Sequence, residues 1–164
     1  MAMRQRSNSE SVELRVPCKP EYVRTVRALV AELADSVPLS LEAVEEVKVA
    51  ASEAVSNIVR HAYENADGSE PVVVRCWKTG GKLTVEIMDR GIGFRVPASE
   101  KAPPPEKSRE REGGLGIVLI KNLMDSVDYW SQPNLGTRIK MTKSGWHRNG
   151  RRTSRTVVHY GAGL

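Results

Sequence analysis

The chain has 164 residues and a formal net charge of +5, and no apolar run reaches the roughly 20 residues of a membrane span. This length fits one domain that folds without disulfides or a structural metal. Its two cysteines, Cys18 and Cys76, lack the spacing of a zinc site and suit a reducing compartment. We therefore expect a cytoplasmic protein with no membrane partner.

The first half of the sequence predicts one strand followed by two helices. Apolar and polar residues alternate over 11–16, which is typical of a half-buried strand. Apolar residues recur at helical spacing from Glu21 onward, and Pro38 ends that pattern. Ser40 is a good N-cap for a second amphipathic helix, which we expect to run to about Tyr63.

The second half predicts a hairpin, a helix and two further strands. Alternating runs at 72–77 and 83–88 flank a short glycine turn, as in a β-hairpin. Residues 116–124 predict a helix, and 127–130 and 137–142 predict strands. The expected fold is α+β, a two-layer sandwich with a mostly antiparallel sheet and helices on one face.

Composition divides the chain into a folded domain and three segments that we expect to be less ordered. We expect a disordered N-terminus at 1–10, a domain at 11–145, and a basic, loosely ordered tail at 146–164. Within the domain, 97–112 is rich in proline and charge and predicts a mobile lid. The tail is either a solvated end or a phosphate-contacting arm. Because few aromatic residues accompany it, we expect no direct nucleic-acid partner.

Three polar side chains share one face of the second helix. Glu53, Asn57 and His61 follow one another at intervals of four residues. A carboxylate and an amide one turn apart suit a general base beside a Mg²⁺ ligand. The same spacing also describes an ordinary solvent-facing surface, so this pattern alone leaves both interpretations open.

Two glycine-containing motifs follow. Asp89-Arg-Gly-Ile-Gly93 comes at the end of a predicted strand, where a carboxylate can accept a hydrogen bond from an adenine amine; a plain turn uses the same residues. The segment 112–117, Glu-Gly-Gly-Leu-Gly-Ile, opens a helix and suits either phosphate binding or a hinge. Neither a Walker motif nor a Rossmann fingerprint is present.

In this order, four motifs resemble those of the GHKL superfamily of ATPases and kinases, whose ATP pocket is the Bergerat fold. They are 53–57, 89–93, 113–116 and Gly136-Thr137. Within that superfamily, the chain is most similar to the anti-sigma factor serine-protein kinases of RsbW and SpoIIAB type, over roughly 11–145.

The resemblance implies a role for each matching residue. Glu53 would be the catalytic base, Asn57 the Mg²⁺ ligand, Asp89 the partner of the adenine amine, and Thr137 its support through a water. The other expected nucleotide contacts are His61, Gly91, Gly93, Gly113, Gly114, Leu115 and Gly116. For His61 we favour a structural or nucleotide-contacting role over phosphorylation.

The resemblance also implies the activity and the partners. The chain would bind ATP or ADP with Mg²⁺, hold a sigma factor inactive as a homodimer, and phosphorylate a serine of a STAS-domain anti-anti-sigma factor. Arg24 matches a family arginine that meets both partners, although an ordinary solvated charge would look the same.

Other functional classes fit less well. The main alternative is a nucleotide-dependent binding switch in the same partner-switching pathway, which transfers no phosphate; the presence of Glu53 favours the kinase, because binding alone needs no base. Half of a split histidine kinase would need a phosphoacceptor helix pair, for which this chain is too short. Only the basic tail supports DNA binding.

Overall fold

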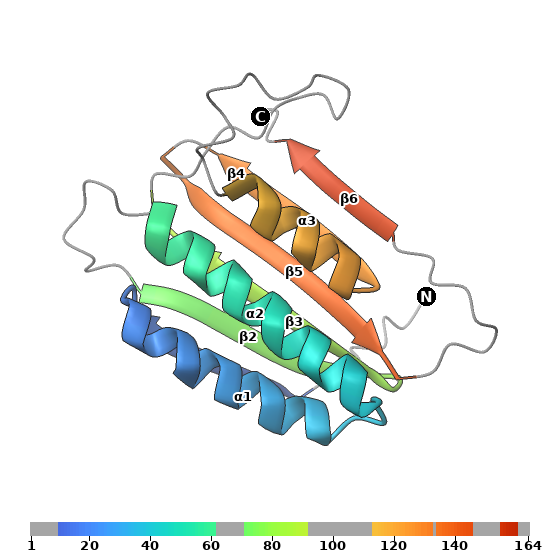
Figure 1. Cartoon of the computed structure of the whole chain (residues 1–164). Coiled ribbons are helices and arrows are strands. Elements are labelled where there is room, and N and C mark those ends of the chain that lie inside the picture. Colours follow the sequence, from blue (N-terminus) through green and yellow to red (C-terminus); the bar gives the residue numbers. More distant parts are fainter. Residues whose placement is uncertain (1–9, 62–70, 92–112, 133, 146–154, 161–164) are drawn as a thin grey trace, which may run out of the picture.

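The computed structural model describes residues 10–61, 71–91, 113–132, 134–145 and 155–160. Within these ranges the chain forms a sheet and a layer of helices (Figure 1). In chain order the elements are β1 (Ser11–Pro17), the 3-10 turn η1 (Pro20–Tyr22), α1 (Val23–Asp35), α2 (Leu41–His61), β2 (Pro71–Thr79), β3 (Lys82–Asp89), α3 (Gly113–Leu123), β4 (Ser126–Gln132), β5 (Gly136–Ser144) and β6 (Arg155–Tyr160).

The strands of the described residues form one sheet in the order β1-β2-β3-β5-β4-β6. The pairs from β1 to β4 are antiparallel, and only β6 runs parallel to its neighbour β4. Helices α1, α2 and α3 all lie over the same face of this sheet (Figure 1). The predicted α+β sandwich, with a mostly antiparallel sheet and helices on one face, is therefore confirmed.

The core lies between the helices and one face of the sheet. Alternate strand residues such as Val74 and Ile87 are fully buried, as expected for side chains that point to one face. Val47 and Val55 of α2, and Ile120 of α3, fill the same layer from the other side. This packing fixes α2 and α3 over the central strands, which is where the predicted site residues lie.

The helix ends follow the sequence signals closely. The hydroxyl of Ser40 accepts a hydrogen bond of 3.1 Å from the backbone N–H of Ala43, which confirms the predicted N-cap of α2. Helix α1 ends at Asp35, before Pro38. Helix α3 begins at Gly113, three residues before the predicted start, because its glycines accept helical backbone angles despite their low propensity.

The C-terminal segment contains a strand that the sequence analysis missed, although Thr156-Val-Val-His-Tyr160 is a run of β-branched and aromatic residues. Residues 155–160, expected to be part of a loosely ordered tail, form the edge strand β6 beside β4. Pairing with β4 supplies the backbone hydrogen bonds of this short strand. The predicted lid at 97–112 lies outside the described residues.

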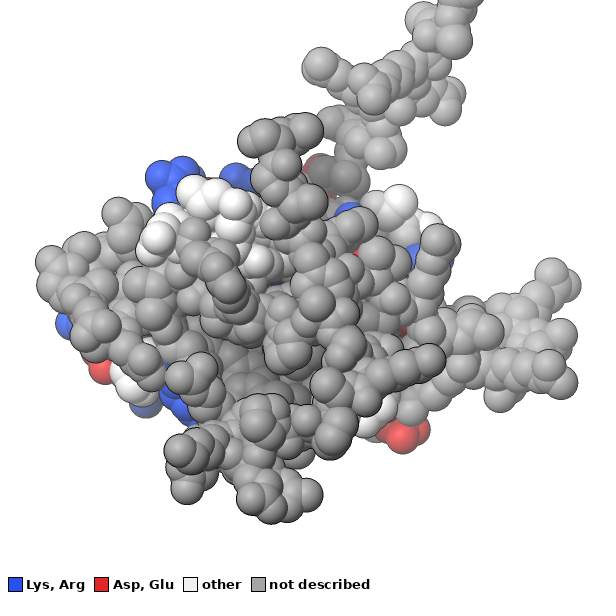
Figure 2. Space-filling model, turned by 90° about the horizontal axis from the view of Figure 1, so that it is seen from above, with Lys and Arg blue, Asp and Glu red and all other residues white. Residues whose placement is uncertain are grey.

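The described part of the chain contains no helix that is both long and apolar enough to cross a bilayer. On the face seen in Figure 2, the described Lys and Arg side chains lie at separate places, with Asp and Glu side chains elsewhere on the same face.

Candidate functional site

Helices α2 and α3 meet at Gly116. A Cβ atom built on Gly116 would lie 2.7 Å from the amide nitrogen of Asn57 and 3.2 Å from a carboxylate oxygen of Glu53. Both distances are too short for an ordinary contact, so only glycine fits here without displacing the two side chains. The structure therefore brings together Glu53, Asn57 and Gly116, which the sequence places in two separate motifs.

The amide oxygen of Asn57 is buried and has no hydrogen-bond partner among the described residues. An unpaired buried oxygen costs free energy unless a ligand uses it. Among the described residues no cluster of three or more His, Cys, Asp and Glu could hold a metal without help. A lone amide oxygen does suit Mg²⁺, which keeps waters and phosphate oxygens as its other ligands.

A second unpaired oxygen lies at the end of β3. Asp89 is 5% exposed, and its Oδ1 accepts a hydrogen bond of 2.7 Å from the backbone N–H of Gly91. Its Oδ2 is buried without a partner among the described residues. Burial raises the pKa of Asp89, while hydrogen bonds from Gly91 and Thr137 oppose that rise. The free oxygen can accept a hydrogen bond from a bound donor.

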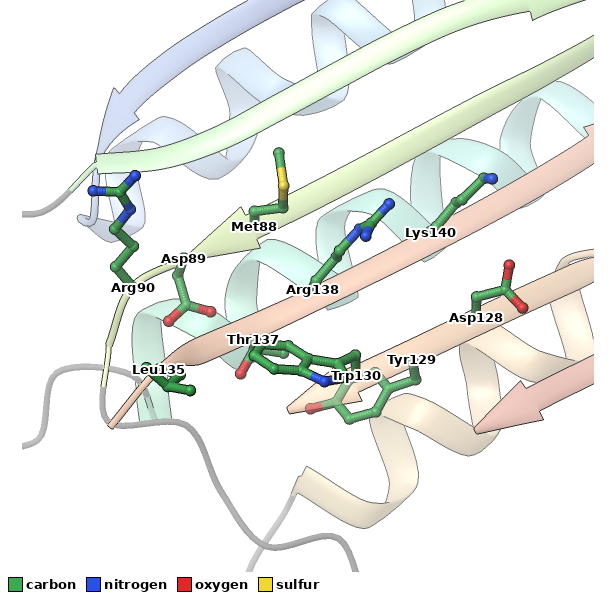
Figure 3. Close-up of a pocket in the computed structure, with 10 residues that line it drawn as sticks. All are labelled: Met88, Asp89, Arg90, Asp128, Tyr129, Trp130, Leu135, Thr137, Arg138 and Lys140. Atoms are coloured by element: carbon green, nitrogen blue, oxygen red, sulfur yellow. The ribbon is translucent and has the colours of Figure 1, made fainter. Parts of the chain in front are cut away.

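Strand β5 supports this carboxylate from the adjacent strand. Thr137 is the register partner of Asp89, and the two lie next to each other at the ends of their strands (Figure 3). The preceding Gly136 has φ +91°, and a Cβ there would lie 2.1 Å from the backbone oxygen of Asp89. Glycine is needed at 136 because this backbone approach leaves no room for a side chain.

Three further residues belong to this end of the site, and sequence analysis missed them. The hydroxyl groups of Ser131 and Thr137 lie 3.1 Å apart, and burial raises the pKa of Tyr129 against hydrogen bonds with the same two residues. Burial raises the pKa of the Cys18 thiol to about 11, with the charge of Asp89 adding to the rise. The signal that could have identified Ser131 is its position: it is a polar residue at a core-facing position of β4.

The cavity drawn in Figure 3 has a volume of about 570 Å³ and reaches Asp89 and Thr137 from the other side of the sheet. Strand alternation puts its Met88, Arg138 and Lys140 on the face that carries no helices. Glu53 and Asn57 do not line this cavity. The cavity and the α2–α3 contact therefore lie on opposite faces, with Asp89 at the strand end between them.

Arg24 is exposed on α1 and lines a separate hollow of about 410 Å³. The same hollow is lined by Arg27 from α1 and by Ser52 from α2. Because Ser52 directly precedes Glu53 in α2, the hollow begins one residue from the predicted base.

The remaining predicted residues are placed only in part. His61 is the last residue of α2, and Gly113, Gly114 and Leu115 form the first turn of α3, but their side-chain surroundings are not described. Gly91 lies two residues after the end of β3 and donates its N–H to Asp89. Gly93 lies outside the described residues.

Residues 16–143 match the family described as Histidine kinase-like ATPase domain. The chain is 34% identical to the serine-protein kinase RsbW of Bacillus pumilus, over 80% of this chain and 84% of that protein. It is 35% identical to the RsbW of Oceanobacillus iheyensis, over 84% and 88% of the two chains, and 33% identical to that of Staphylococcus aureus, again over 84% and 88%.

Solved structures share the fold at lower identity. A crystal structure of the RsbU and RsbW domains of a Mycobacterium tuberculosis protein matches with a TM-score of 0.61 and 19% identity. This match covers 82% of the present chain but 32% of that longer one. The histidine kinase domain of a blue-light-activated kinase from Erythrobacter litoralis matches with a TM-score of 0.50 and 18% identity, over 79% and 62% of the two chains.

The family match spans most of the chain, and the identity to the RsbW proteins extends over at least four fifths of it. The chain therefore belongs to the histidine kinase-like ATPase family and, within it, to the RsbW anti-sigma factor serine-protein kinases.

Proposed function

We propose that this protein binds Mg-ATP, holds a sigma factor inactive, and phosphorylates a serine of a STAS-domain anti-anti-sigma factor. The observation that carries the proposal is the contact of Gly116 with Glu53 and Asn57. It joins a carboxylate, an unpaired amide oxygen and the first turn of a helix in one place. Phosphoryl transfer needs a base, a metal ligand and phosphate donors at such a point.

The nucleotide base would lie against the strand ends. The free Oδ2 of Asp89 accepts a hydrogen bond from the exocyclic amine of adenine, and Thr137 holds the carboxylate from the adjacent strand. The triphosphate then extends toward α3, whose N-terminal N–H groups carry the positive end of the helix dipole. Gly91, Gly93, Gly113, Gly114, Leu115 and His61 complete this set as nucleotide contacts.

Asn57 would hold Mg²⁺ through its unpaired Oδ1, and the ion would neutralise charge on the phosphates. Glu53 takes the proton of the serine hydroxyl of the partner protein. The serine oxygen forms a bond to the γ-phosphorus while the bond between that phosphorus and the bridging β-oxygen breaks. The products are phosphoserine and ADP, and the proton remains on Glu53 until solvent removes it.

The hollow at Arg24 supports a role for this arginine in partner binding. It offers two arginines beside the helix that carries Glu53, so a docked protein would bring its serine toward the base from this side. A homodimer, which the family resemblance implies, is part of the proposal and is checked by analytical ultracentrifugation.

The experiment is a transfer assay. The purified protein is incubated with Mg²⁺, γ-labelled ATP and STAS-domain proteins of the same genome, beside the variants Glu53→Gln and Glu42→Gln. Glu42 is exposed in the first turn of the same helix, so its variant is a matched control.

Label should appear on a STAS serine with the natural protein and with Glu42→Gln, and should vanish with Glu53→Gln while ATP still binds. If ATP binds but no STAS protein is labelled, the kinase proposal is wrong. Sigma-factor capture in the presence of ATP and ADP would then test the binding switch.

A further inference from the structure

A buried lysine lies at the end of β5. Lys143 is 3% exposed, and its ammonium group forms an ion pair with Glu46 of α2. The same group donates a 2.6 Å hydrogen bond to the backbone oxygen of Leu123 and lies 3.9 Å from a carboxylate oxygen of Asp125. A buried charge is tolerated only with such partners, because it loses its hydration.

The hydrogen bond from Lys143 to the carbonyl of Leu123 caps the C-terminal end of helix α3. Leu123 is the last residue of α3, and its carbonyl is one of the helix-end acceptors that lack an intrahelical partner. A cation at this position also complements the negative end of the helix dipole. Asp125 reinforces the junction, because its backbone N–H bonds to Thr142 and its carboxylate accepts two hydrogen bonds from Ser144.

The two helices that Lys143 joins are the ones that form the site. Glu46 lies two turns before Glu53 on α2, and Figure 1 shows α2 and α3 over the same face of the sheet. Gly116 and Leu123 are seven residues apart, so about 10 Å of helix connects the Lys143 contact to the site. Lys143 thus holds one end of a short helix whose other end contacts Glu53 and Asn57.

We infer that Lys143 is a positioning residue for the nucleotide site and acts by fixing the C-terminal end of α3. The contact at Gly116 leaves no free space, since a single added Cβ would lie 2.7 Å from Asn57. A small shift of α3 therefore changes the distances among Gly116, Asn57 and Glu53. The inference rests on the proposed function for its catalytic and nucleotide-binding readouts, but not for its exchange readout.

The test separates positioning from simple stability. Lys143→Met alone removes the cation opposite the partly buried carboxylate of Glu46 and can unfold the chain, so the decisive variant is Lys143→Met with Glu46→Gln, which removes both charges of this pair. Glu46→Gln alone keeps the bond from Lys143 to Leu123. The matched control is Lys48→Met, which removes the ion pair with Glu45 at the exposed surface of α2.

Four quantities are measured at a temperature at which circular dichroism shows every variant to be folded. They are hydrogen exchange of the amides at 117–123, the Kd for Mg-ATP, and kcat and KM for transfer to the STAS serine. The double variant should exchange faster in α3 and raise both the Kd and the KM for ATP about tenfold or more, with a smaller change in kcat. Glu46→Gln and Lys48→Met should stay within about twofold of the natural protein.

Two results would overturn the inference. The first is a folded double variant that keeps the natural Kd for ATP and the natural exchange rates, since Lys143 would then contribute stability alone. The second is a loss for Glu46→Gln equal to that of the double variant, since the ion pair and not the helix-end bond would be responsible.

Failure of the proposed function is distinguishable from failure of this inference. If the natural protein binds ATP without transferring phosphate, the Kd and the exchange rates still decide on Lys143. If it binds no nucleotide, the exchange rates alone decide, and unchanged exchange at 117–123 in the double variant counts against the inference.

Discussion

The two parts of the proposed site differ in what their close-packed glycines contact. At the proposed adenine side, Gly136 and Thr137 of β5 lie against the backbone and side chain of Asp89 at the end of β3. At the proposed phosphate side, Gly116 of α3 lies against the ends of two side chains from α2. Both contacts leave no room for a Cβ atom. Gly136 lies against the backbone of Asp89, which is fixed in the sheet, whereas Gly116 lies against side chains that can change rotamer.

Because of this difference, a substitution at Gly136 should mainly affect the stability of the fold, and one at Gly116 should mainly affect the function. Backbone within a paired sheet cannot move without breaking ladder hydrogen bonds, so a clash at Gly136 should destabilise the fold. The side chains of Asn57 and Glu53 can adopt other rotamers at modest cost, so a clash at Gly116 should disturb the chemistry while leaving the fold intact. Four substitutions test this comparison.

Gly136→Ala should have the largest effect. The added Cβ would lie 2.1 Å from the Asp89 backbone oxygen at φ +91°, so we expect a loss of roughly 3 kcal/mol or more in the free energy of unfolding. Urea denaturation followed by circular dichroism measures it. Gly80→Ala is the matched control, because Gly80 also has positive φ but open space around it; about 1 kcal/mol is expected there. Equal losses at the two positions would contradict the backbone clash.

Asp89→Asn should have its main effect on nucleotide binding. The amide can keep the bond from Gly91 only by placing its NH₂ where Oδ2 now lies, so it would oppose the adenine amine. We expect the affinity for ATP to fall about 100-fold, with the protein still folded. Isothermal titration measures the Kd, and an unchanged value would remove Asp89 from the adenine pocket.

The same substitution should change how stability depends on pH. Burial raises the pKa of Asp89 in the folded chain above its ordinary value of 3.8. At a pH between 3.8 and the folded-state pKa, the folded chain therefore binds more protons than the unfolded chain. The contribution of Asp89 to stability is therefore present at low pH and is lost as the pH rises through the folded-state pKa. The ligand-free Asn variant should gain stability relative to the natural protein, more at pH 7 than at pH 4, in thermal denaturation.

Gly116→Ala should lower turnover more than stability. The methyl group displaces Asn57 and Glu53, and a misplaced base and metal ligand cost about 10- to 100-fold in kcat/KM. Alanine is also the better helix former by about 0.5–1 kcal/mol, which offsets part of the crowding. The melting temperature should therefore change little while phosphate transfer falls. A large drop in melting temperature would mean that the phosphate side is as rigid as the adenine side.

The sequence could predict the sheet, the helices and most of their boundaries because each rests on local signals. Alternation in the strands, the Ser40 cap and Pro38 all act within a few residues, and the structure agrees with them. Strand β6 was missed although Thr156-Val-Val-His-Tyr160 has a high strand propensity, because the basic residues before it favoured a tail. Its place beside β4 is a tertiary contact that local signals do not give.

The sequence could predict the separate motifs of the site, but not how their residues contact one another. The motifs around Glu53, Asp89 and Gly116 point to nucleotide chemistry, whereas the close contact of Gly116 with Asn57 depends on how two helices pack. Lys143 carries no motif-level signal of its role, because its partners come from α2, α3 and the segment that follows α3.

Ser131→Ala should give the smallest of the four effects and tests whether the adenine side extends to β4. The hydroxyl of Ser131 lies 3.1 Å from that of Thr137 and 3.4 Å from the Gly136 oxygen that it donates to. Its loss should cost about 1 kcal/mol of stability and only a few-fold in ATP affinity, since Thr137 keeps its place opposite Asp89. Ser126→Ala, at the start of the same strand on the other face, should change stability by less than about 0.5 kcal/mol. If the two serine variants behave alike in melting and titration, the adenine side ends at Thr137; if Ser131→Ala weakens both, β4 supports the carboxylate through Thr137.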